Sequence, residues 1–461
     1  MSTAVPRLPP AHVDQVTGNR RVAETINNIL GFQHDDSRIR TPAEAAAGVT
    51  PVNYSYAPGD VRRYGAKWDG VTDDHAALVA AYLQATQANG APVFWPPGVG
   101  LCASQFSTGA NVLTCGVGKG ASILRKGFNG DLIIWGSGSG FRDVQIDGNS
   151  GSFTGRSATI AASTNGQYSD SCEWIHSSGY HVEYLGQDPG SNSYFISCDF
   201  SPTLIPANGV AIKYSGTTDS QAIPRSIINC HGGGAYLVDF GAANDSFFIG
   251  NFTNGMVWSS ANVSHVFALG NRIALNGATL TVKGGETILL GNSIAGPIVF
   301  DATTAGCMFL SNPGTGWDSI TDSGAGNYID IKQVGYTPTW VSSGGGASLG
   351  NATVAAQWSR TGNTVCVDID ILIGSTTNFG TGTIQIGLPS SPSSFSQFVV
   401  GIAYLNDAST GTNTIAAAIS NPALSYLNLQ ANGTTGAVSG TVPWTWATGD
   451  RITLHAQYST P

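Results

Sequence analysis

Three residues that could carry out acid–base chemistry each come directly after a cysteine: Glu173, Asp199 and His231. Two carboxylates held close together raise one another's proton affinity, so that one can donate a proton while the other stays ionised. Glycoside hydrolysis needs such a pair, with carboxyls about 5–5.5 Å apart for retention or about 6.5–9.5 Å apart for inversion. We interpret Glu173 and Asp199 as a candidate acid and a candidate nucleophile or base, and His231 as a residue that orients or tunes them.

The same three residues have an alternative interpretation as a solvated polar face. Such a face would only keep apolar side chains from stacking on the outside of the fold. Glutamate is rare in this chain, which makes an outward glutamate more informative than usual. The glutamates are Glu24, Glu44, Glu173, Glu183 and Glu286.

A second group of polar residues lies in the two segments that separate these cysteines. A lyase acting on a uronic acid needs a base and a group that neutralises the substrate carboxylate, and Tyr180 or His181 with Arg225 could supply them. Calcium-dependent elimination needs several acids from neighbouring parts of the fold, and the sequence shows no dense acidic cluster. We therefore favour hydrolysis over elimination and predict no metal site and no cofactor. The residues assigned to substrate binding are Tyr180, His181, Glu183, Asp219 and Arg225.

Both groups depend on a sequence repeat that would place successive residues above one another. Two or three apolar residues, a small residue and then Asn or Cys recur down the chain, with asparagines 20, 21 and 20 residues apart. A period near 20 residues suits one coil of a solenoid with three short strands. We predict that the asparagines stack at one corner, each amide bonding the backbone of a neighbouring coil. They are Asn251, Asn271, Asn292 and Asn312, and the cysteines in the same position are Cys172, Cys198 and Cys230.

Strand alternation places the residue after each corner on the outside of its coil. Because adjacent coils lie about 4.8 Å apart, these residues should form a vertical column. Two of the repeats, 172–198 and 198–230, are longer than the others, and we expect the extra residues to form loops. We predict that segments 176–194 and 201–225 wall a groove beside the acidic pair. The column reads Val144, Glu173, Asp199, His231, Phe252, Arg272, Ser293 and Pro313.

Composition and charge exclude several classes of protein. A net charge of −9 and a pI near 5.2 would repel nucleic acid. No stretch reaches the roughly 18 apolar residues that span a bilayer, and the first residues lack the apolar core of a signal peptide. We therefore expect synthesis in a cytoplasm, release by another route and no membrane insertion. Seven widely spaced cysteines without a Cys-x-x-Cys motif indicate small buried residues rather than a disulfide framework.

The segment before the repeats contains several local structural signals in a definite order. They are an Asp-Gly turn at 69–70, the acidic pair Asp73 and Asp74, a run of small residues predicted to be helical from about 73 to 89, and Pro-Pro-Gly at 96–98. Gly tolerates the positive φ of a tight turn, and either aspartate could cap the helix. We expect this helix to cover the open end of the first coil.

This order resembles the entry segment of right-handed parallel β-helix proteins of the pectate-lyase and phage-tailspike type. The resemblance implies an all-β fold with three parts: a short adaptor over 1–58, a right-handed parallel β-helix over 59–332 and a jelly-roll-like β-sandwich over 333–461. Thr-Pro-Thr-Trp at 337–340 and Thr-Gly-Asp-Arg-Ile at 448–452 are similar to C-terminal domains of phage tail proteins. Such domains typically trimerise the spike, and some bind sugar. Trp444, Trp446 and Tyr426 could therefore stack on sugars, or belong to the core or to the trimer interface.

The resemblance also implies a function. It points to a homotrimeric tailspike of the virion that binds and depolymerises a bacterial surface polysaccharide, namely a capsule, an exopolysaccharide or an O-antigen. Residues 1–58 would attach it to a phage tail or baseplate protein, and no nucleic acid would bind. The alternatives are a receptor-binding or structural spike without catalysis and a free-standing pectinase-like enzyme. The segment 50–54, Thr-Pro-Val-Asn-Tyr, resembles the linker that precedes the β-helix in many tailspikes and counts against the last alternative.

Overall fold

The computed structural model describes most of the chain beyond residue 39, and almost all of its regular structure is β. The helices of the described part are α3 (Pro42–Ala46), α4 (His75–Gln87) and the 3₁₀ turn η2 (Val61–Tyr64). The all-β class and the parallel β-helix predicted from the repeats are confirmed. The described residues are 40–161, 164–185, 192–201, 209–215, 225–232, 236–241, 244–275, 277–313, 320–393, 398–421, 425–433 and 436–460.

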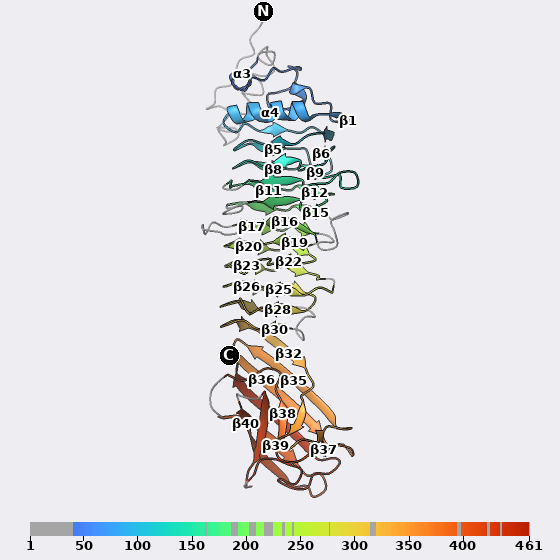
Figure 1. Ribbon diagram of the computed structural model, residues 1–461, viewed down its shortest axis with the longest axis vertical. Coiled ribbons are helices and arrows are strands. Elements are labelled where there is room, and N and C mark those ends of the chain that lie inside the picture. The colour runs from blue at the N-terminus through green and yellow to red at the C-terminus, as the bar shows by residue number, and fades with distance from the viewer. Residues whose placement is uncertain are drawn as a thin grey trace, which may run out of the picture. The chain divides into compact units, whose positions relative to one another are not determined.

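The chain divides into two compact units, residues 1–260 and 261–461. In the first unit each full coil gives one strand to each of three parallel sheets, here called A, B and C (Figure 1). Sheet A contains β2 (Val93–Phe94), β5 (Leu113–Cys115), β8 (Gly140–Arg142), β11 (Tyr168–Asp170), β14 (Tyr194–Ile196), β17 (Arg225–Ile228) and β20 (Ser246–Ile249). Sheet B contains β1 (Asp69–Asp73), β3 (Gly98–Cys102), β6 (Ser122–Lys126), β9 (Gln145–Asp147), β12 (Glu173–Ile175), β15 (Asp199–Ser201), β18 (His231–Gly232) and β21 (Phe252–Thr253). Sheet C contains β4 (Phe106–Ser107), β7 (Ile133–Ile134), β10 (Ala158–Ile160), β13 (Val182–Tyr184), β16 (Val210–Tyr214), β19 (Tyr236–Asp239) and β22 (Met256–Val257).

The second unit begins with further parallel coils. Its sheet A strands are β23 (Val266–Leu269), β26 (Ile288–Leu290), β29 (Met308–Leu310) and β31 (Tyr328–Ile329). Its sheet B strands are β24 (Arg272–Ile273) and β27 (Ser293–Ile294). A separate three-stranded parallel sheet consists of β25 (Leu280–Val282), β28 (Ile298–Phe300) and β30 (Ile320–Asp322). The antiparallel part of this unit starts immediately afterwards, at Ile331.

The corner between sheets A and B explains the sequence repeat. In five successive coils of the first unit, from Asp143 onward, the chain turns at a residue with positive φ, and a buried residue follows it. The turn residues are Asp143, Ser171, Ser197, Asn229 and Gly250. The buried residues that follow them are Val144, Cys172, Cys198, Cys230 and Asn251. The sequence repeat therefore consists of a small or polar turn residue followed by a compact buried residue.

The asparagine ladder is present in the second unit. The Asn292 side-chain oxygen accepts the backbone N–H of Asn271 at 3.0 Å and its amide nitrogen at 2.8 Å. The Asn312 oxygen accepts the same two groups of Asn292 at 2.8 and 2.9 Å. In the first unit, the Asn251 oxygen accepts the backbone N–H of Cys230 at 2.8 Å. The prediction of stacked corner asparagines is confirmed, and their amides satisfy backbone groups that would otherwise be buried without partners.

The helix α4 covers the first coil, as the entry segment predicted. Its buried face includes Leu78 and Tyr82, and the Tyr82 ring stacks on Phe106 with centroids 5.3 Å apart. Asp73 accepts the N–H of His75 at 3.0 Å, so that this aspartate holds the first turn of the helix. Asp74 instead accepts the N–H of Lys67 at 2.7 Å and fastens the preceding turn.

Residues just after position 39 are tied to the first coil by a buried ion pair. Glu44 and Arg63 are both fully buried, with Glu44 Oε1 2.6 Å from Arg63 Nε and Oε2 3.1 Å from Nη2. The Tyr64 hydroxyl donates to Oε1 at 2.9 Å, and the N–H of Thr41 donates to Oε2 at 2.7 Å. The described part of the predicted adaptor therefore packs on the solenoid, while residues 1–39 lie outside the described residues.

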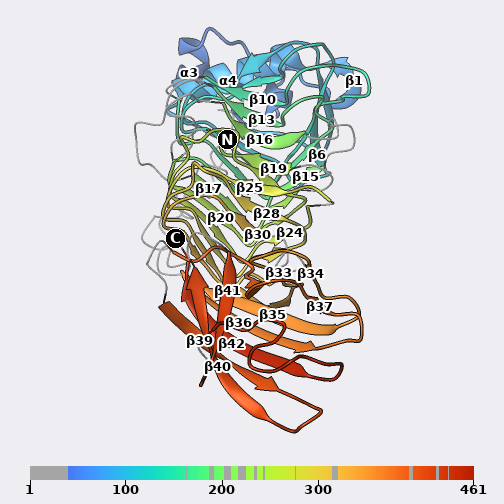
Figure 2. The same cartoon turned by 60° about the horizontal axis from the view of Figure 1, so that its bottom comes forward.

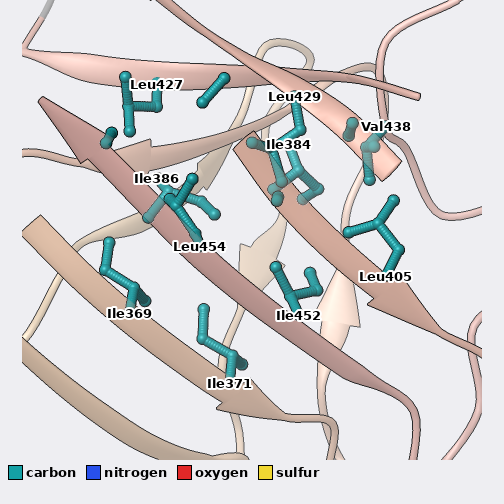
Figure 3. Packing of buried hydrophobic residues seen from close by; sticks show 14 of the residues in the cluster. Ile369, Ile371, Ile384, Ile386, Leu405, Leu427, Leu429, Val438, Ile452 and Leu454 are labelled. Carbon is teal, nitrogen blue, oxygen red and sulfur yellow. The ribbon is translucent and has the colours of Figure 1, made fainter. Parts of the chain in front are cut away.

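The C-terminal β unit is present and has a different connectivity from a two-sheet sandwich. Nine of the described strands form one antiparallel sheet, because β42 pairs with both β36 and β39 and so joins the two halves (Figure 2). The sheet curls around a core of aliphatic side chains such as Ile369, Leu405 and Leu454 (Figure 3). Its order is β32 (Ile331–Gly335), β35 (Thr353–Thr361), β36 (Thr364–Leu372), β42 (Arg451–Ser459), β39 (Phe398–Asn406), β40 (Asn413–Asn421), β41 (Tyr426–Ala431), β38 (Ile384–Gly387) and β33 (Trp340–Ser342), with β34 (Ala347–Ser348) and β37 (Asn378–Phe379) paired separately.

Two of the three C-terminal aromatic residues considered for sugar binding pack against this core. Trp446 stacks on the buried Phe379 with ring centroids 5.2 Å apart and an interplanar angle of 20°. Trp444 lies 5.4 Å from Trp446 and also contacts the core. These two indoles are therefore explained by packing, and Tyr426 is half-buried in β41.

Candidate functional site

The outer face of sheet B carries the predicted row of acid, acid and imidazole. Glu173, Asp199 and His231 are the first residues of β12, β15 and β18. Glu173 pairs directly with Asp199, and Asp199 pairs directly with His231. The residues that follow the two acids, Trp174 and Phe200, are buried inside the coil, so the acids point outward. The predicted alignment of these three side chains is therefore confirmed.

One member of the predicted column is wrong by one residue. Glu173 pairs with Gln145 on its other side, and Val144 occupies the buried corner instead. Asp143 is the positive-φ turn residue that precedes the corner, so the outward position of this coil falls on Gln145. Gln145 also contacts the site, because its Nε2 donates to Glu173 Oε2 at 2.6 Å. Gln145 thus fixes one oxygen of the Glu173 carboxylate.

A lysine far away in the sequence completes this row. Lys119 lies in the turn before β6, between two glycines with positive φ, and its ammonium group bonds Asp199. Both groups are partly exposed, at 43% for the Lys119 side chain and 34% for Asp199. The hydrogen bond to Asp199 raises the pKa of Lys119 above its ordinary value, and Glu173 contributes to the same shift. Lys119 therefore stays protonated at neutral pH. Lys119 was not predicted from the sequence as a site residue. The only local sign of it was its place in a Gly-Lys-Gly turn.

His231 approaches Asp199 from the other side of the row. Its Nδ1 lies 3.8 Å from Asp199 Oδ1, which is longer than a hydrogen bond. The imidazole also lies against Phe252 of the next coil, with ring centroids 5.1 Å apart. Asp199 therefore lies between Lys119, which donates a hydrogen bond to it, and His231, which is close to it without a hydrogen bond.

A second polar column runs beside the first on the same face. Asp147 is nearly buried and accepts Arg125 Nε at 2.9 Å, and its other oxygen lies 3.0 Å from His176 Nδ1. Arg125 and Asp147 are direct neighbours on β6 and β9. These residues were not predicted from the sequence, since the spacing of one column gives no information about the column beside it. The outer face of sheet B near Glu173 therefore carries ion pairs in two neighbouring columns.

Part of the competing group lies on the outer face of sheet C. Glu183 bonds the hydroxyl of Ser215, and its Oε2 lies 2.9 Å from Arg156 Nε. Lys213 donates to the Tyr180 hydroxyl at 2.8 Å, and its ammonium also lies 4.7 Å from the centre of the Tyr180 ring. Glu183 and Lys213 are register partners on β13 and β16. Tyr180 and Glu183 are therefore brought into one neighbourhood, on a different sheet from the acidic row.

Two other residues of that group face the interior. His181 is fully buried against Phe200, with ring centroids 5.9 Å apart, and burial lowers the pKa of His181 to about 3. Arg225 is also buried, and its Nη1 donates to the carbonyl of Asn244 at 2.6 Å. The assignment of these two residues to direct substrate binding is corrected, because neither side chain reaches the surface. Asp219 lies outside the described residues.

The geometry of sheet B permits two-carboxylate chemistry. Neighbouring strands lie about 4.8 Å apart, so carboxylates on adjacent strands fall within reach of the separations that glycosidases use. Much of the segments 176–194 and 201–225 lies outside the described residues, and the predicted groove stays a prediction. Within the part of the chain that the structure describes, no group of three or more His, Cys, Asp or Glu side chains is placed to hold a metal ion. No helix among the described residues is long and apolar enough to cross a membrane.

Comparisons with known proteins agree with the resemblance to phage tail proteins. No family model matches the chain. A curated relative is the "Mu-like prophage FluMu defective tail fiber protein" of Haemophilus influenzae, 29% identical over 128 residues, or 27% of this chain. The chain spans only 20% of the length of that relative.

Solved structures of similar fold include tailspikes and parallel β-helix enzymes. The Dettilon tailspike protein is 11% identical, with a TM-score of 0.41 and coverage of 87% of this chain and 94% of that chain. A protein of Geobacillus virus E2 is 12% identical, with a TM-score of 0.44 and coverage of 84% and 79%. A glycan biofilm modifying enzyme of Pantoea stewartii is 10% identical, with a TM-score of 0.37 and coverage of 89% and 61%. At this level of similarity no residue role transfers to this chain.

Proposed function

We propose that this chain is a phage tailspike that binds and depolymerises a bacterial surface polysaccharide by glycoside hydrolysis. The observation that carries the proposal is the outward, in-register pair Glu173 and Asp199, which Gln145 and Lys119 hold in place. The tail-fibre relative and the entry segment support the phage context. The virion would be its location, and residues 1–58 its attachment to the tail.

The contacts of the two carboxylates assign them different roles. Glu173 accepts a hydrogen bond from the neutral Gln145 amide, and we assign Glu173 as the general acid. Asp199 is held by the Lys119 ammonium group, and we assign Asp199 as nucleophile or as the base that activates water. His231 lies beside Asp199 and would orient it. The carboxyl separation in the substrate complex decides between retention and inversion.

The test is depolymerisation of polysaccharides from a panel of encapsulated bacteria, followed by size-exclusion chromatography. Glu173→Gln and Asp199→Asn should each reduce the rate by at least ~10²–10⁴, the contribution of one proton transfer, while binding to the same polysaccharide remains. Asp170→Asn is the matched control, since Asp170 is an exposed acid of the same coil on sheet A that pairs with Arg142. Full activity in both site variants would show that the row is only a solvated face. Binding without cleavage by the unmodified protein would favour a non-catalytic spike.

A second candidate is elimination on a uronic acid at sheet C. The Tyr180 hydroxyl and the Lys213 ammonium form a close pair, and the ion pair of Glu183 and Arg156 lies beside them. In this candidate Tyr180 would abstract the proton, and the neighbouring cations would neutralise the substrate carboxylate. A lyase product carries an unsaturated uronic end that absorbs in the near ultraviolet, and a hydrolase product does not. Ultraviolet-absorbing products that disappear in Tyr180→Phe but persist in Glu173→Gln would select this candidate.

A further inference from the structure

The outer face of sheet A is apolar, unlike the outer face of sheet B. In the second unit every outward side chain of its sheet A strands is aliphatic, aromatic or methionine, in strands β23, β26, β29 and β31. Leu290 and Tyr328 are each 41% exposed. The residues are Phe267, Leu269, Ile288, Leu290, Met308, Leu310 and Tyr328, and we call them the apolar strip of the second unit.

The first unit carries a strip of the same type. The outward positions of β14, β17 and β20 are apolar apart from Ser226, and the Tyr194 ring stacks on Tyr168 at 5.3 Å. The charged pair that precedes the strip, Arg142 and Asp170, is internally neutralised at 3.2 Å. The strip consists of Tyr194, Ile196, Ile228, Phe247 and Ile249.

The interior of the coils is packed without these outward side chains. The inward residues of the same strands, such as Phe248 and Leu289, already fill the interior of the coils. On the same coil as Leu290, the outward residue of sheet B is Ser293, and on the preceding coil it is Arg272. Parallel sheets that are apolar on both faces are normally covered on both faces. A series of partly exposed apolar side chains along one face marks an interaction surface.

We propose that the apolar strips of sheet A are the surface along which copies of this chain associate. Charge favours a second copy as the occupant: the chain carries a net charge of −9, yet the strips carry none, so identical chains can meet there without repulsion. Leu290 and Tyr328 are each 41% exposed and Tyr194 is 36% exposed, and the twelve side chains together offer on the order of 500 Å², a large part of the ~800 Å² per partner in a standard interface. Each strip also repeats coil by coil, so that a parallel copy meets equivalent levels along its length.

This inference stands independently of the proposed function. It makes the sheet A face of the coils, and not only residues 333–461, responsible for the predicted homotrimer. Sheet B and its acidic row stay free in such an assembly. A partner of another kind on sheet A is an outcome of the test below.

The experiment measures the mass of the full-length protein by light scattering at several concentrations. The unmodified chain should form an oligomer, about 143 kDa for three copies of a 47.6-kDa chain. Leu290→Asp combined with Leu310→Asp should weaken association at least tenfold, while Ser293→Asp, on sheet B of the same coil as Leu290, should leave it unchanged. A monomeric unmodified protein, or an oligomer that the double variant leaves intact, would overturn the inference.

A second measurement keeps the inference testable if the charged variants fail to fold. Leu290→Cys and Ser293→Cys are treated with a short bismaleimide and separated on a denaturing gel. Cross-linked chains are expected from Leu290→Cys and not from Ser293→Cys. Equal cross-linking at both positions, or none at Leu290→Cys, would refute sheet A as the contact face.

Discussion

Removing the charge of Glu44 should open the N-terminal end of the solenoid. Glu44 and Arg63 are both fully buried and share two hydrogen bonds, so Glu44→Gln leaves a buried guanidinium without its counter-charge. Breaking a buried pair in this way costs about 3–5 kcal/mol. Since about 1.4 kcal/mol corresponds to a factor of ten, amides of residues 61–64 should exchange with solvent roughly 10² to 4 × 10³ times faster.

The assay is native-state hydrogen exchange followed by mass spectrometry of the peptide that spans residues 61–66. Arg62→Gln is the matched control, because Arg62 pairs with Asp60 while remaining partly exposed, and surface pairs contribute at most about 1 kcal/mol. Deleting residues 1–39 keeps Glu44 and should leave exchange unchanged, whereas deleting residues 1–55 removes it and should accelerate exchange as Glu44→Gln does. If Glu44→Gln exchanged no faster than Arg62→Gln, the reasoning from burial would be refuted.

Three further predictions test the corner ladder, a buried histidine and the new lysine. Asn292→Leu removes the partners of the buried Asn271 N–H and Ala268 carbonyl, and should cost about 2–5 kcal/mol in chemical denaturation, against almost nothing for Ser293→Ala. Burial lowers the pKa of His181 to about 3, so its contribution to stability is complete above the unfolded value near 6.5 and is lost as the pH falls from there toward 3. His181→Leu should flatten the pH dependence of the denaturation midpoint in that window, and an unchanged slope would contradict it. Lys119→Met should reduce the depolymerisation rate about tenfold and Lys119→Arg much less, because only the arginine keeps a cation on Asp199; equal rates in both would remove Lys119 from the site.

Burial of Glu44 by itself would raise its pKa, but hydrogen bonds from Arg63, Thr41 and Tyr64 outweigh this effect and hold the pKa below its ordinary value. The pair therefore stabilises the fold above pH 4.5, the ordinary value, and loses its contribution as the pH falls through the folded pKa. This window opens only below pH 4.5, whereas that of His181 already opens below about 6.5, so the two overlap at lower pH. Because Glu44 bonds Arg63 and Tyr64 directly, exchange of residues 61–66 measured at pH 5 and pH 3 reports on the Glu44 pair.

The sequence by itself determined the periodic features of this protein. The Asn and Cys corners predicted the coils, because each coil must satisfy the same buried backbone groups with the same kind of side chain. Strand alternation then predicted that Glu173, Asp199 and His231 share one outer face. Whether a side chain points in or out depends only on its place in its own strand, which the sequence shows. The off-by-one error at Val144 occurred where neither Asn nor Cys marks the corner.

Tertiary structure decided everything that depends on distance in the sequence. Lys119 reaches Asp199 across 80 residues, through a turn whose direction no periodic pattern encodes. His181 and Arg225 resembled surface residues, but His181, just before β13, and Arg225, the first residue of β17, are both buried inside the coil. The apolar outer face of sheet A also emerges only when strands about 20 residues apart are stacked, because each strand alone reads as an ordinary buried β-strand.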